Sequence, residues 1–177
     1  PRVTDPSSPV MRRLAEGLAA SRDVRVLGSY YFGTRHLTLN RPAFKPSDLT
    51  GLKIRSLPFA LYRTTVEGLG GRPVPIDWAE TPGALRNGVV DGQENPVNII
   101  RSAELYRSQS HLILTGHIIS VQVLAVNGSV WNRLSAVQRR ALQDAADISC
   151  RWATEELKAR EEADLAALRA SGMTLID

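Results

Sequence analysis

The stretch Leu52-Lys53-Ile54-Arg55-Ser56-Leu57-Pro58 decides the fold class of this chain. Its first five residues predict a short strand that follows the loop residues 45–51. Pro58 begins a predicted helix that ends near Leu69, because Gly70 and Gly71 suit a helix end that requires positive φ. A strand followed by a helix is the unit that α/β proteins repeat.

The same order of strand and helix recurs on both sides of this stretch. Downstream, residues 73–76 predict a strand, and Asp77 suits the N-cap of a short helix that ends at Asn87-Gly88. This alternation predicts an α/β fold with a mainly parallel sheet. The remaining expected elements are a helix at 9–21, a short buried strand at 24–28, an irregular or extended segment at 30–39, a very short strand and turn at 89–92, a helix near 97–107, strands at 112–115 and 121–126 that are broken near Gly116-His117, a long helix at 135–170 and a final strand at 173–176.

The composition indicates a globular protein with a packed core. Of 177 residues, 43% are hydrophobic and 23% charged, which is ordinary for such a protein. The net charge of +4 comes from scattered basic residues without interleaved aromatic residues, so no nucleic-acid partner is predicted. The single cysteine, Cys150, excludes an intrachain disulfide, and we expect it to fill a small space in the core. No apolar run reaches the roughly 18 residues that a membrane-spanning helix needs.

Common catalytic motifs are absent from the sequence. It contains no GxGxxG, no phosphate-binding loop with GK[ST] and no GxSxG nucleophile turn. The three histidines, His36, His111 and His117, are well separated and have no carboxylate cluster at metal-ligand spacing beside them. We therefore expect no enzyme, no cofactor and no metal site. A hydrolase or isomerase that uses Glu94 or His117 is the remaining catalytic alternative.

Polar and aromatic side chains follow the ends of several predicted strands. Arg55 and Asn95 each come at or just after a strand end, Trp78 follows a third strand, and Arg35 lies in a loop. Because ligands of open α/β sheets bind outside the carboxyl ends of the strands, these four side chains could converge on one pocket. A guanidinium pairs with both oxygens of a carboxylate, and an indole packs against a carbon skeleton. The residue types therefore predict a pocket for a small organic acid.

Each of these four residues also has an ordinary structural interpretation. Arg55 could form a surface ion pair, and Trp78 could belong to the core. Asn95, before Pro96, could stabilise a turn, and Arg35 could be solvated. The residue pattern by itself leaves these alternatives open.

Two segments of the chain resemble a known protein family. Asp48–Arg55 (Asp-Leu-Thr-Gly-Leu-Lys-Ile-Arg) and Gly88–Pro96 (Gly-Val-Val-Asp-Gly-Gln-Glu-Asn-Pro) are similar to segments of the substrate-binding proteins of tripartite ATP-independent periplasmic (TRAP) transporters, the C4-dicarboxylate-binding family. Leu114–His117 and Trp131–Ser135 are also similar. The resemblance runs from about Leu27 to the end of the chain.

The resemblance implies two α/β lobes around a cleft, a long helix that crosses both lobes, and hinge closure of the lobes over a ligand. The implied ligands are carboxylates such as dicarboxylates, sialic acid, pyruvate or other oxo acids. They would be captured in the periplasm and delivered to TRAP membrane subunits. The family's ligand-binding positions fall on Arg55 (the carboxylate-binding arginine), Asn95 (its supporting asparagine), Trp78 (the aromatic wall) and Arg35 (a second arginine), with Gln93 and His117 as further candidates.

The chain departs from the family in its extent. The resemblance implies that the first strand–helix units of lobe one and the stretch after Asp177 are missing, and no signal peptide is visible. We expect residues 1–35 to be a remnant of the first lobe, 36–118 to be the second, ligand-binding lobe, and 119–177 to be a return strand and a long helix that links the lobes. Strands without neighbours would expose their edges. A homo-oligomer is therefore expected, and a non-binding oligomeric module is the alternative to a receptor.

Overall fold

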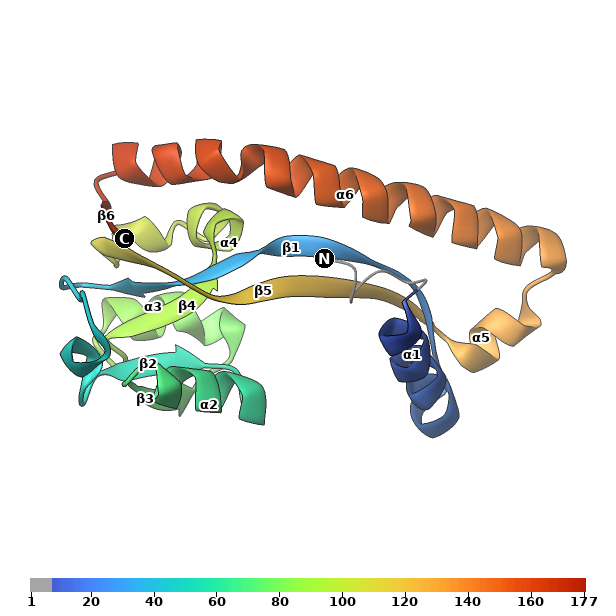
Figure 1. The fold of residues 1–177 in the computed structure, drawn as a ribbon, viewed down its shortest axis with the longest axis horizontal. Coiled ribbons are helices and arrows are strands. Elements are labelled where there is room, and N and C mark those ends of the chain that lie inside the picture. Colours follow the sequence, from blue (N-terminus) through green and yellow to red (C-terminus); the bar gives the residue numbers. More distant parts are fainter. Residues whose placement is uncertain (1–7) are drawn as a thin grey trace. The chain divides into compact units, whose positions relative to one another are not determined.

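The computed structural model describes residues 8–177 and alternates strands with helices (Figure 1). Short 3-10 helices at Pro46–Leu49, Trp78–Glu80 and Leu105–Arg107 lie in the connections. The main elements are α1 (Pro9–Arg22), β1 (Val24–Leu39), β2 (Lys53–Ser56), α2 (Ala60–Gly68), β3 (Arg72–Pro75), α3 (Thr81–Arg86), β4 (Gly92–Pro96), α4 (Val97–Ser102), β5 (His111–Asn127), α5 (Gly128–Arg133), α6 (Ala136–Ala170) and β6 (Thr174–Ile176).

The strands form one six-stranded sheet in the order β3-β2-β4-β1-β5-β6. β2 is parallel to both β3 and β4, and β5 is parallel to β6. β1 runs antiparallel to β4, with Arg35 opposite Pro96 and Thr38 opposite Gln93. The predicted α/β class with a mainly parallel sheet is therefore confirmed, with β1 as the strand of opposite direction.

The chain divides into two compact units, and β1, β5 and α6 each contribute residues to both. Unit 1 comprises Ser120–Ala159 and the chain up to Phe32, and unit 2 comprises Gly33–Ile119 and Arg160–Asp177. The sequence-based division instead placed boundaries at residues 35 and 118 and kept α6 with the return strand. Residues 1–7 of that first segment lie outside the described residues.

Unit 2 contains two apolar clusters. In one of them, Leu37 and Leu39 of β1 pack with Ile54 of β2 and Val66 of α2, and α2 lies beside β2 and β3 (Figure 1). In the other, the last turns of α6 supply Leu168, which packs with residues of α3 and α4. An ion pair between Arg101 and Asp164 also joins α4 to α6.

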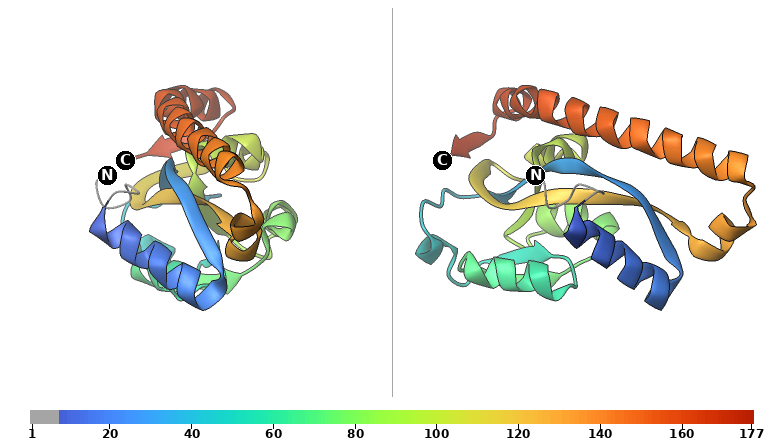
Figure 2. Two further views of the ribbon diagram at one scale, coloured as in Figure 1. Left: turned by 90° about the vertical axis from the view of Figure 1, so that its right-hand side faces the viewer. Right: turned by 45° about the vertical axis from the view of Figure 1, so that its right-hand side comes forward.

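Unit 1 has a smaller core, made of Leu27, Trp131 and Ala146. Cys150 is buried beside Gly28, where an added Cβ would lie 2.9 Å from the cysteine Sγ. This close approach requires glycine at position 28. The expected role of Cys150 as a small core residue is therefore confirmed. The helix that carries it, α6, is continuous over 35 residues (Figure 2).

Two predicted interruptions of strands were wrong. Residues 24–39 form one strand, so the extended alternative for 30–39 is confirmed and the break before it was wrong, and residues 111–127 form one strand rather than two. Gly116 adopts φ 55° within β5, a conformation that costs a glycine little. Its N–H donates to Nδ1 of His36, at 3.1 Å. Because a side chain satisfies this backbone donor, the strand continues past the position that the sequence marked as a break.

The predicted strand and turn at 89–92 was also wrong, because the strand there is Gly92–Pro96. Its three consecutive polar residues are typical of a turn, yet all five residues of the strand are buried. Polar residues are stable in a buried strand when their side chains have hydrogen-bond partners. Asn95 is therefore a strand residue of β4 and not a turn residue.

The helix predicted near 97–107 and the capping role of Asp77 need smaller corrections. α4 ends at Ser102, and Leu105–Arg107 is a separate 3-10 helix, because Glu104 adopts a left-handed conformation with φ 50°. The Asp77 side chain makes no capping hydrogen bond. Its carbonyl oxygen instead accepts from the hydroxyl of Thr81, the first residue of α3.

Candidate functional site

Arg55 is buried in unit 2, with a relative exposure of 1%. It lies on β2, opposite Val74 of β3 and Gln93 of β4. Its Nε donates to the carbonyl oxygen of Ile76 at 2.8 Å. Its Nη2 is buried and has no hydrogen-bond partner. Since buried polar groups are nearly always hydrogen-bonded, an unpaired guanidinium nitrogen is unusual for a residue with a purely structural role.

The indole of Trp78 lies against the Arg55 guanidinium. The arginine Cζ is 5.6 Å from the ring centroid, within the range of a cation–π contact. Trp78 is 40% exposed, because it stands on a 3-10 helix in the connection after β3. Burial lowers the pKa of Arg55, and the nearby positive charge of Arg35 lowers it further, while Glu94 and Asp77 act in the opposite direction. Its surroundings therefore stabilise the cation less well than water does.

A second cation of the site, Arg35, is fully engaged with β4. Its Nε and Nη2 donate to the two carboxylate oxygens of Glu94, at 2.5 and 2.8 Å. Nη2 also donates to the Glu94 carbonyl oxygen and to Oδ1 of Asn95. The guanidinium lies 5.2 Å from the ring centroid of Tyr62. This is the bidentate geometry that makes arginine–carboxylate pairs strong.

Glu94 has a second partner in His117. Nε2 of His117 lies 3.1 Å from Glu94 Oε2, and its Nδ1 lies 2.6 Å from the hydroxyl of Thr115. Burial acts to raise the pKa of Glu94, but the hydrogen bonds from His117 and Arg35 and their charges lower it, and the net shift is downward. Glu94 is therefore a carboxylate, held between an arginine and a histidine.

A chain of neutral polar side chains continues from this ion pair. Asn95 donates to Gln93, at 2.6 Å, and Gln93 donates to the Thr38 hydroxyl, at 3.0 Å. That hydroxyl donates to Gln109, at 2.9 Å. Thr38 and Gln93 stand directly opposite each other on antiparallel strands, where cross-strand pairs interact most closely. These bonds hold the Asn95 amide beside Arg35.

The structure therefore places all six sequence-predicted site residues in unit 2, and it excludes the particular structural interpretations that the sequence offered for four of them. Arg55 and Arg35 are buried rather than solvent-exposed, so neither is a surface ion pair or a solvated side chain. Trp78 is not a core residue. Asn95, Gln93, Arg35 and His117 belong to one hydrogen-bonded network around Glu94. Arg55, on the adjacent strand β2, contacts Trp78 of the 3-10 helix after β3.

Sequence reasoning missed the structural importance of Glu94, which it considered only as a catalytic residue. It also missed Thr38, Gln109 and Tyr62. These residues come from elements far apart in the chain: the register of β1 against β4 brings Thr38 opposite Gln93, Gln109 bonds to Thr38, and Tyr62 of α2 lies over Arg35. The one local signal was a run of three polar residues before a proline, which indicates a turn as readily as a buried strand.

The charged side chains of the site can pair with an anion through Arg55. Within residues 8–177, no group of three or more His, Cys, Asp or Glu side chains could hold a metal ion. Glu94 and His117 are within hydrogen-bond distance, but the carboxylate is neutralised by Arg35 and has a lowered pKa. A general base needs a pKa near the working pH, so this carboxylate is poorly suited to catalysis.

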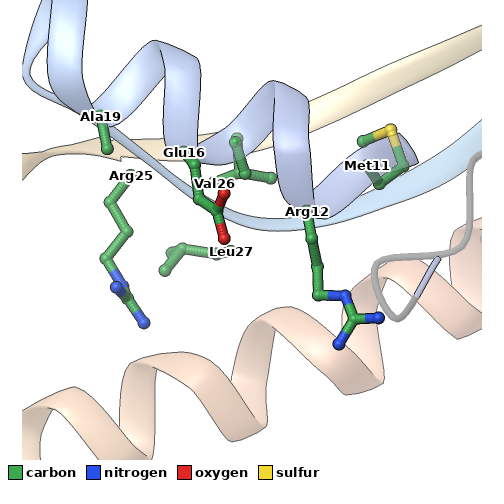
Figure 3. Close-up of a pocket in the computed structure, with 8 residues that line it drawn as sticks. Met11, Arg12, Glu16, Ala19, Arg25, Val26 and Leu27 are labelled. Carbon is green, nitrogen blue, oxygen red and sulfur yellow. The ribbon is translucent and has the colours of Figure 1, made fainter. Parts of the chain in front are cut away.

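Unit 1 contains a separate pocket between α1 and β1 (Figure 3). Arg12 and Glu16 reach it from α1, and Arg25 reaches it from β1. All three charged residues are exposed, and Arg25 lies over the ring of Trp131 at 4.5 Å. The pocket therefore lacks the buried, unpaired polar group that distinguishes Arg55.

In the described part of the chain, no helix is both long and apolar enough to span a bilayer.

Comparison with known proteins gives a consistent result. Residues 6–177 match the family model described as bacterial extracellular solute-binding protein, family 7. The chain is 31% identical over 154 residues to the ectoine-binding periplasmic protein of Halomonas elongata, which covers 87% of this chain and 45% of that protein.

Solved structures show the same likeness. A TRAP periplasmic solute-binding protein from Roseobacter denitrificans with bound 3-deoxy-D-manno-oct-2-ulosonic acid superposes with a TM-score of 0.93 at 28% identity, over 97% of this chain and 58% of that one. Another from the same organism, with bound L-galactonate, gives a TM-score of 0.91 at 31% identity, over 97% and 57% of the two chains. The chain spans about half the length of the relatives that it matches.

Proposed function

Because the chain belongs to family 7 of the bacterial extracellular solute-binding proteins, we propose that it forms the ligand-capturing part of a periplasmic receptor for small organic acids. In this proposal Arg55 pairs with the carboxylate of the ligand, and the bound ligand is passed to the membrane subunits of a TRAP-type transporter. The protein catalyses no reaction in this role.

One observation carries the proposal: the buried Arg55 side chain has an unpaired Nη2. Leaving a buried donor without a partner costs about 1–3 kcal/mol. A carboxylate would remove this cost, since it accepts from a guanidinium through two parallel hydrogen bonds. The lowered pKa of Arg55 agrees with this view, because an anion at this position would stabilise the charged form.

Two neighbours of Arg55 fit the same ligand chemistry. The Asn95 amide uses one N–H for Gln93 and has a second to offer. The half-exposed indole of Trp78 offers an apolar face for a carbon skeleton. Both compounds named in the Roseobacter structures, 3-deoxy-D-manno-oct-2-ulosonic acid and L-galactonate, are hydroxylated carboxylic acids, and this supports the assignment by analogy.

We assign Arg35, Gln93 and His117 to the wall of the site, where they hold Asn95 in place through the network around Glu94. The ligand-binding lobe corresponds to residues 36–118 in this assignment. The compact unit Gly33–Ile119 with Arg160–Asp177 supports that boundary at the N-terminal side and adds the end of α6 to the lobe.

Binding assays with the Arg55→Met variant test the proposal. Isothermal calorimetry and thermal-shift measurements would use a panel of organic acids that includes L-galactonate, 3-deoxy-D-manno-oct-2-ulosonic acid, succinate and pyruvate. An acid present at 100 times its Kd adds about 2.7 kcal/mol of stability. We expect at least one acid to bind the natural sequence, and Arg55→Met to abolish that binding. The matched control is Arg63→Met, an exposed arginine of α2.

Two outcomes would contradict the receptor assignment. One is that no acid binds, while a full-length relative responds in the same assay. The other is that Arg55→Met binds the acids as tightly as the natural sequence does, because the carboxylate would then have another partner.

A second candidate is a non-binding module that self-associates, and the exposed apolar side chains of unit 1 favour it. Leu14 of α1 and Ile148 and Trp152 of α6 are each more than half exposed. Sheet edges support it less, because the edge strand β3 contains Pro73 and Pro75, and proline has no N–H for strand pairing. Light scattering distinguishes the two candidates: an oligomer indifferent to acids supports the module, and a monomer that binds an acid supports the receptor.

A further inference from the structure

α6 carries an apolar stripe on the exposed side of its unit 1 portion. Val137, Ile148 and Trp152 are 79, 62 and 65% exposed, and Ala141 and Ala145 between them are exposed as well. At 3.6 residues per turn, these five positions fall within an arc of about 80° and extend over about four turns. We call the five residues the α6 stripe. A continuous apolar patch of this kind marks an interaction surface, whereas a single exposed apolar side chain does not.

The α6 stripe lies opposite the side by which α6 packs within unit 1. On the packed side, Ala146 and Cys150 are buried, and Gln143 donates to the carbonyl oxygen of Leu27 at 2.7 Å. These positions point about half a turn away from the stripe. A helix that packs on one side typically presents polar residues on the other. The second apolar side of α6 therefore indicates a second partner.

The charged residues along one edge of the α6 stripe alternate in sign. Arg140, Asp144, Arg151 and Glu155 are all exposed. Among the ion pairs of residues 8–177, none includes any of these four. Within the helix, each arginine precedes its acidic neighbour by four residues, which is the less favourable order for such a pair. The four charges are therefore available to another chain.

We propose that the α6 stripe binds the α6 stripe of a second copy of this chain, with the two helices antiparallel. In one register, Trp152 lies against Ala141 of the second copy. The same register sets Ile148 against Ala145 of the second copy. Each large side chain then meets a small one, and this alternation lets facing helices interdigitate. A parallel pair would instead place each residue against its own copy, so that the two Trp152 side chains would collide.

The same register brings opposite charges together. Because the antiparallel pair is symmetric, the charged edge of one helix faces the charged edge of the other. Arg140 then lies beside Glu155 of the second copy, and Asp144 lies beside Arg151 of the second copy. Charges along the edges of paired helices set their orientation and their choice of partner. The alternation of sign therefore favours a second copy over an unrelated partner.

Analytical ultracentrifugation of the 177-residue chain tests the association. Two helices that touch over about four turns bury less area than a standard interface, so we expect a dissociation constant on the order of 1–100 μM. Trp152→Glu should weaken the dimer at least about 10-fold, which is about 1.4 kcal/mol. The matched control is Leu61→Glu on α2, a side chain that is 63% exposed. This control should leave the equilibrium unchanged.

Two charge reversals test the antiparallel register. Asp144→Arg places like charges opposite each other in its own dimer, and so does Arg151→Glu, because positions 144 and 151 face each other. Each variant alone should therefore associate at least about 10-fold more weakly than the natural sequence. Mixed in equal amounts, the two variants should form a heterodimer, since every facing pair then has opposite charges. All the substituted side chains are exposed, so the folded chain tolerates the changes.

Three results would overturn this inference. The natural sequence could remain a monomer above the expected range of dissociation constants, it could form a dimer that Trp152→Glu does not weaken, or the two charge variants could fail to associate when mixed. The inference goes beyond the proposed function and does not depend on it, because the α6 stripe shares no residue with the candidate site of unit 2. A dimer that binds an organic acid supports both, whereas a monomer that binds one overturns this inference alone.

Discussion

Replacing Arg55 with methionine should stabilise the ligand-free protein while it removes ligand binding. The two effects have opposite signs because one side chain is poorly satisfied in the fold and well suited to a ligand. Arg55 is 1% exposed, and its Nη2 has no partner. Methionine keeps a long apolar side chain in the same space and removes both the charge and the unpaired donors.

The expected magnitude follows from the contacts of the guanidinium. The substitution removes the cost of the unpaired donor, about 1–3 kcal/mol. It also removes the cost of desolvating the buried charge. It loses one charge-assisted hydrogen bond to Ile76, about 1.5–3 kcal/mol, and a partly exposed contact with Trp78, about 0.5–1 kcal/mol. The pKa of Arg55 is lowered, so the surroundings favour the neutral form overall. The hydrogen-bond and ring contacts outweigh or offset the relief at Nη2, so the desolvation cost of the buried charge, several kcal/mol, decides the sign. A net gain of about 1 kcal/mol would raise the Tm by about 2–4 °C in a chain of this size.

Urea unfolding and calorimetry of the natural sequence, Arg55→Met and Arg63→Met would measure this gain. The exposed Arg63 should change the free energy of unfolding by no more than about 0.5 kcal/mol. With a bound acid at 100 times its Kd, the natural sequence should gain about 2.7 kcal/mol and become the most stable of the three. A loss of more than about 1 kcal/mol in ligand-free Arg55→Met would refute the reasoning, because Arg55 would then be a structural cation.

Three further predictions concern parts of the fold outside the Arg55 contact. Burial, and then the charge of His117, lowers the pKa of His36 to about 4, below the ordinary value of 6.5. The unfolded chain therefore binds more protons between these pH values, and the free energy of unfolding should fall by up to about 3 kcal/mol as the pH drops from 6.5 to 4. Urea unfolding at both pH values should show a smaller fall in the His36→Gln variant. Gly92→Ala should lower the free energy of unfolding by about 2–3 kcal/mol, since its Cβ would lie 2.3 Å from a backbone oxygen of β1. Gly17→Ala, in open space on α1, should raise it by about 0.5–1 kcal/mol. Equal effects of the two substitutions in urea unfolding would contradict this packing. Burial raises the pKa of the Cys150 thiol, so a thiol reagent should label it much more slowly in the native state than in urea, and equal rates would count against its burial.

Local chemistry was sufficient to predict most elements and the fold class. The helix of residues 60–68 ends before Gly70, which adopts φ 99°, and this requirement for positive φ is visible in the sequence itself. The alternation of short apolar strands with helices depends on residues close together in the chain, and so do the residue types of a carboxylate site at strand ends. The position of Arg55 at the end of an apolar strand was visible in this way.

Predictions failed where a distant residue supplied a missing partner. Gly116 continues β5 because its N–H finds His36, 80 residues away, and the polar segment of β4 is a strand because its side chains pair with β1. No local pattern contains these partners, so the sequence indicated a break and a turn instead.

The identity of the candidate binding residues was determined by the sequence, and their state was decided by the tertiary structure. Arg35 and Glu94 are 59 residues apart and pair only through the antiparallel register of β1 and β4. That register pairs one arginine with a carboxylate and leaves the other hydrogen-bonded to a carbonyl oxygen only. Two arginines look alike in a sequence. They differ only after folding, because the free energy of a buried charge depends on which groups surround it.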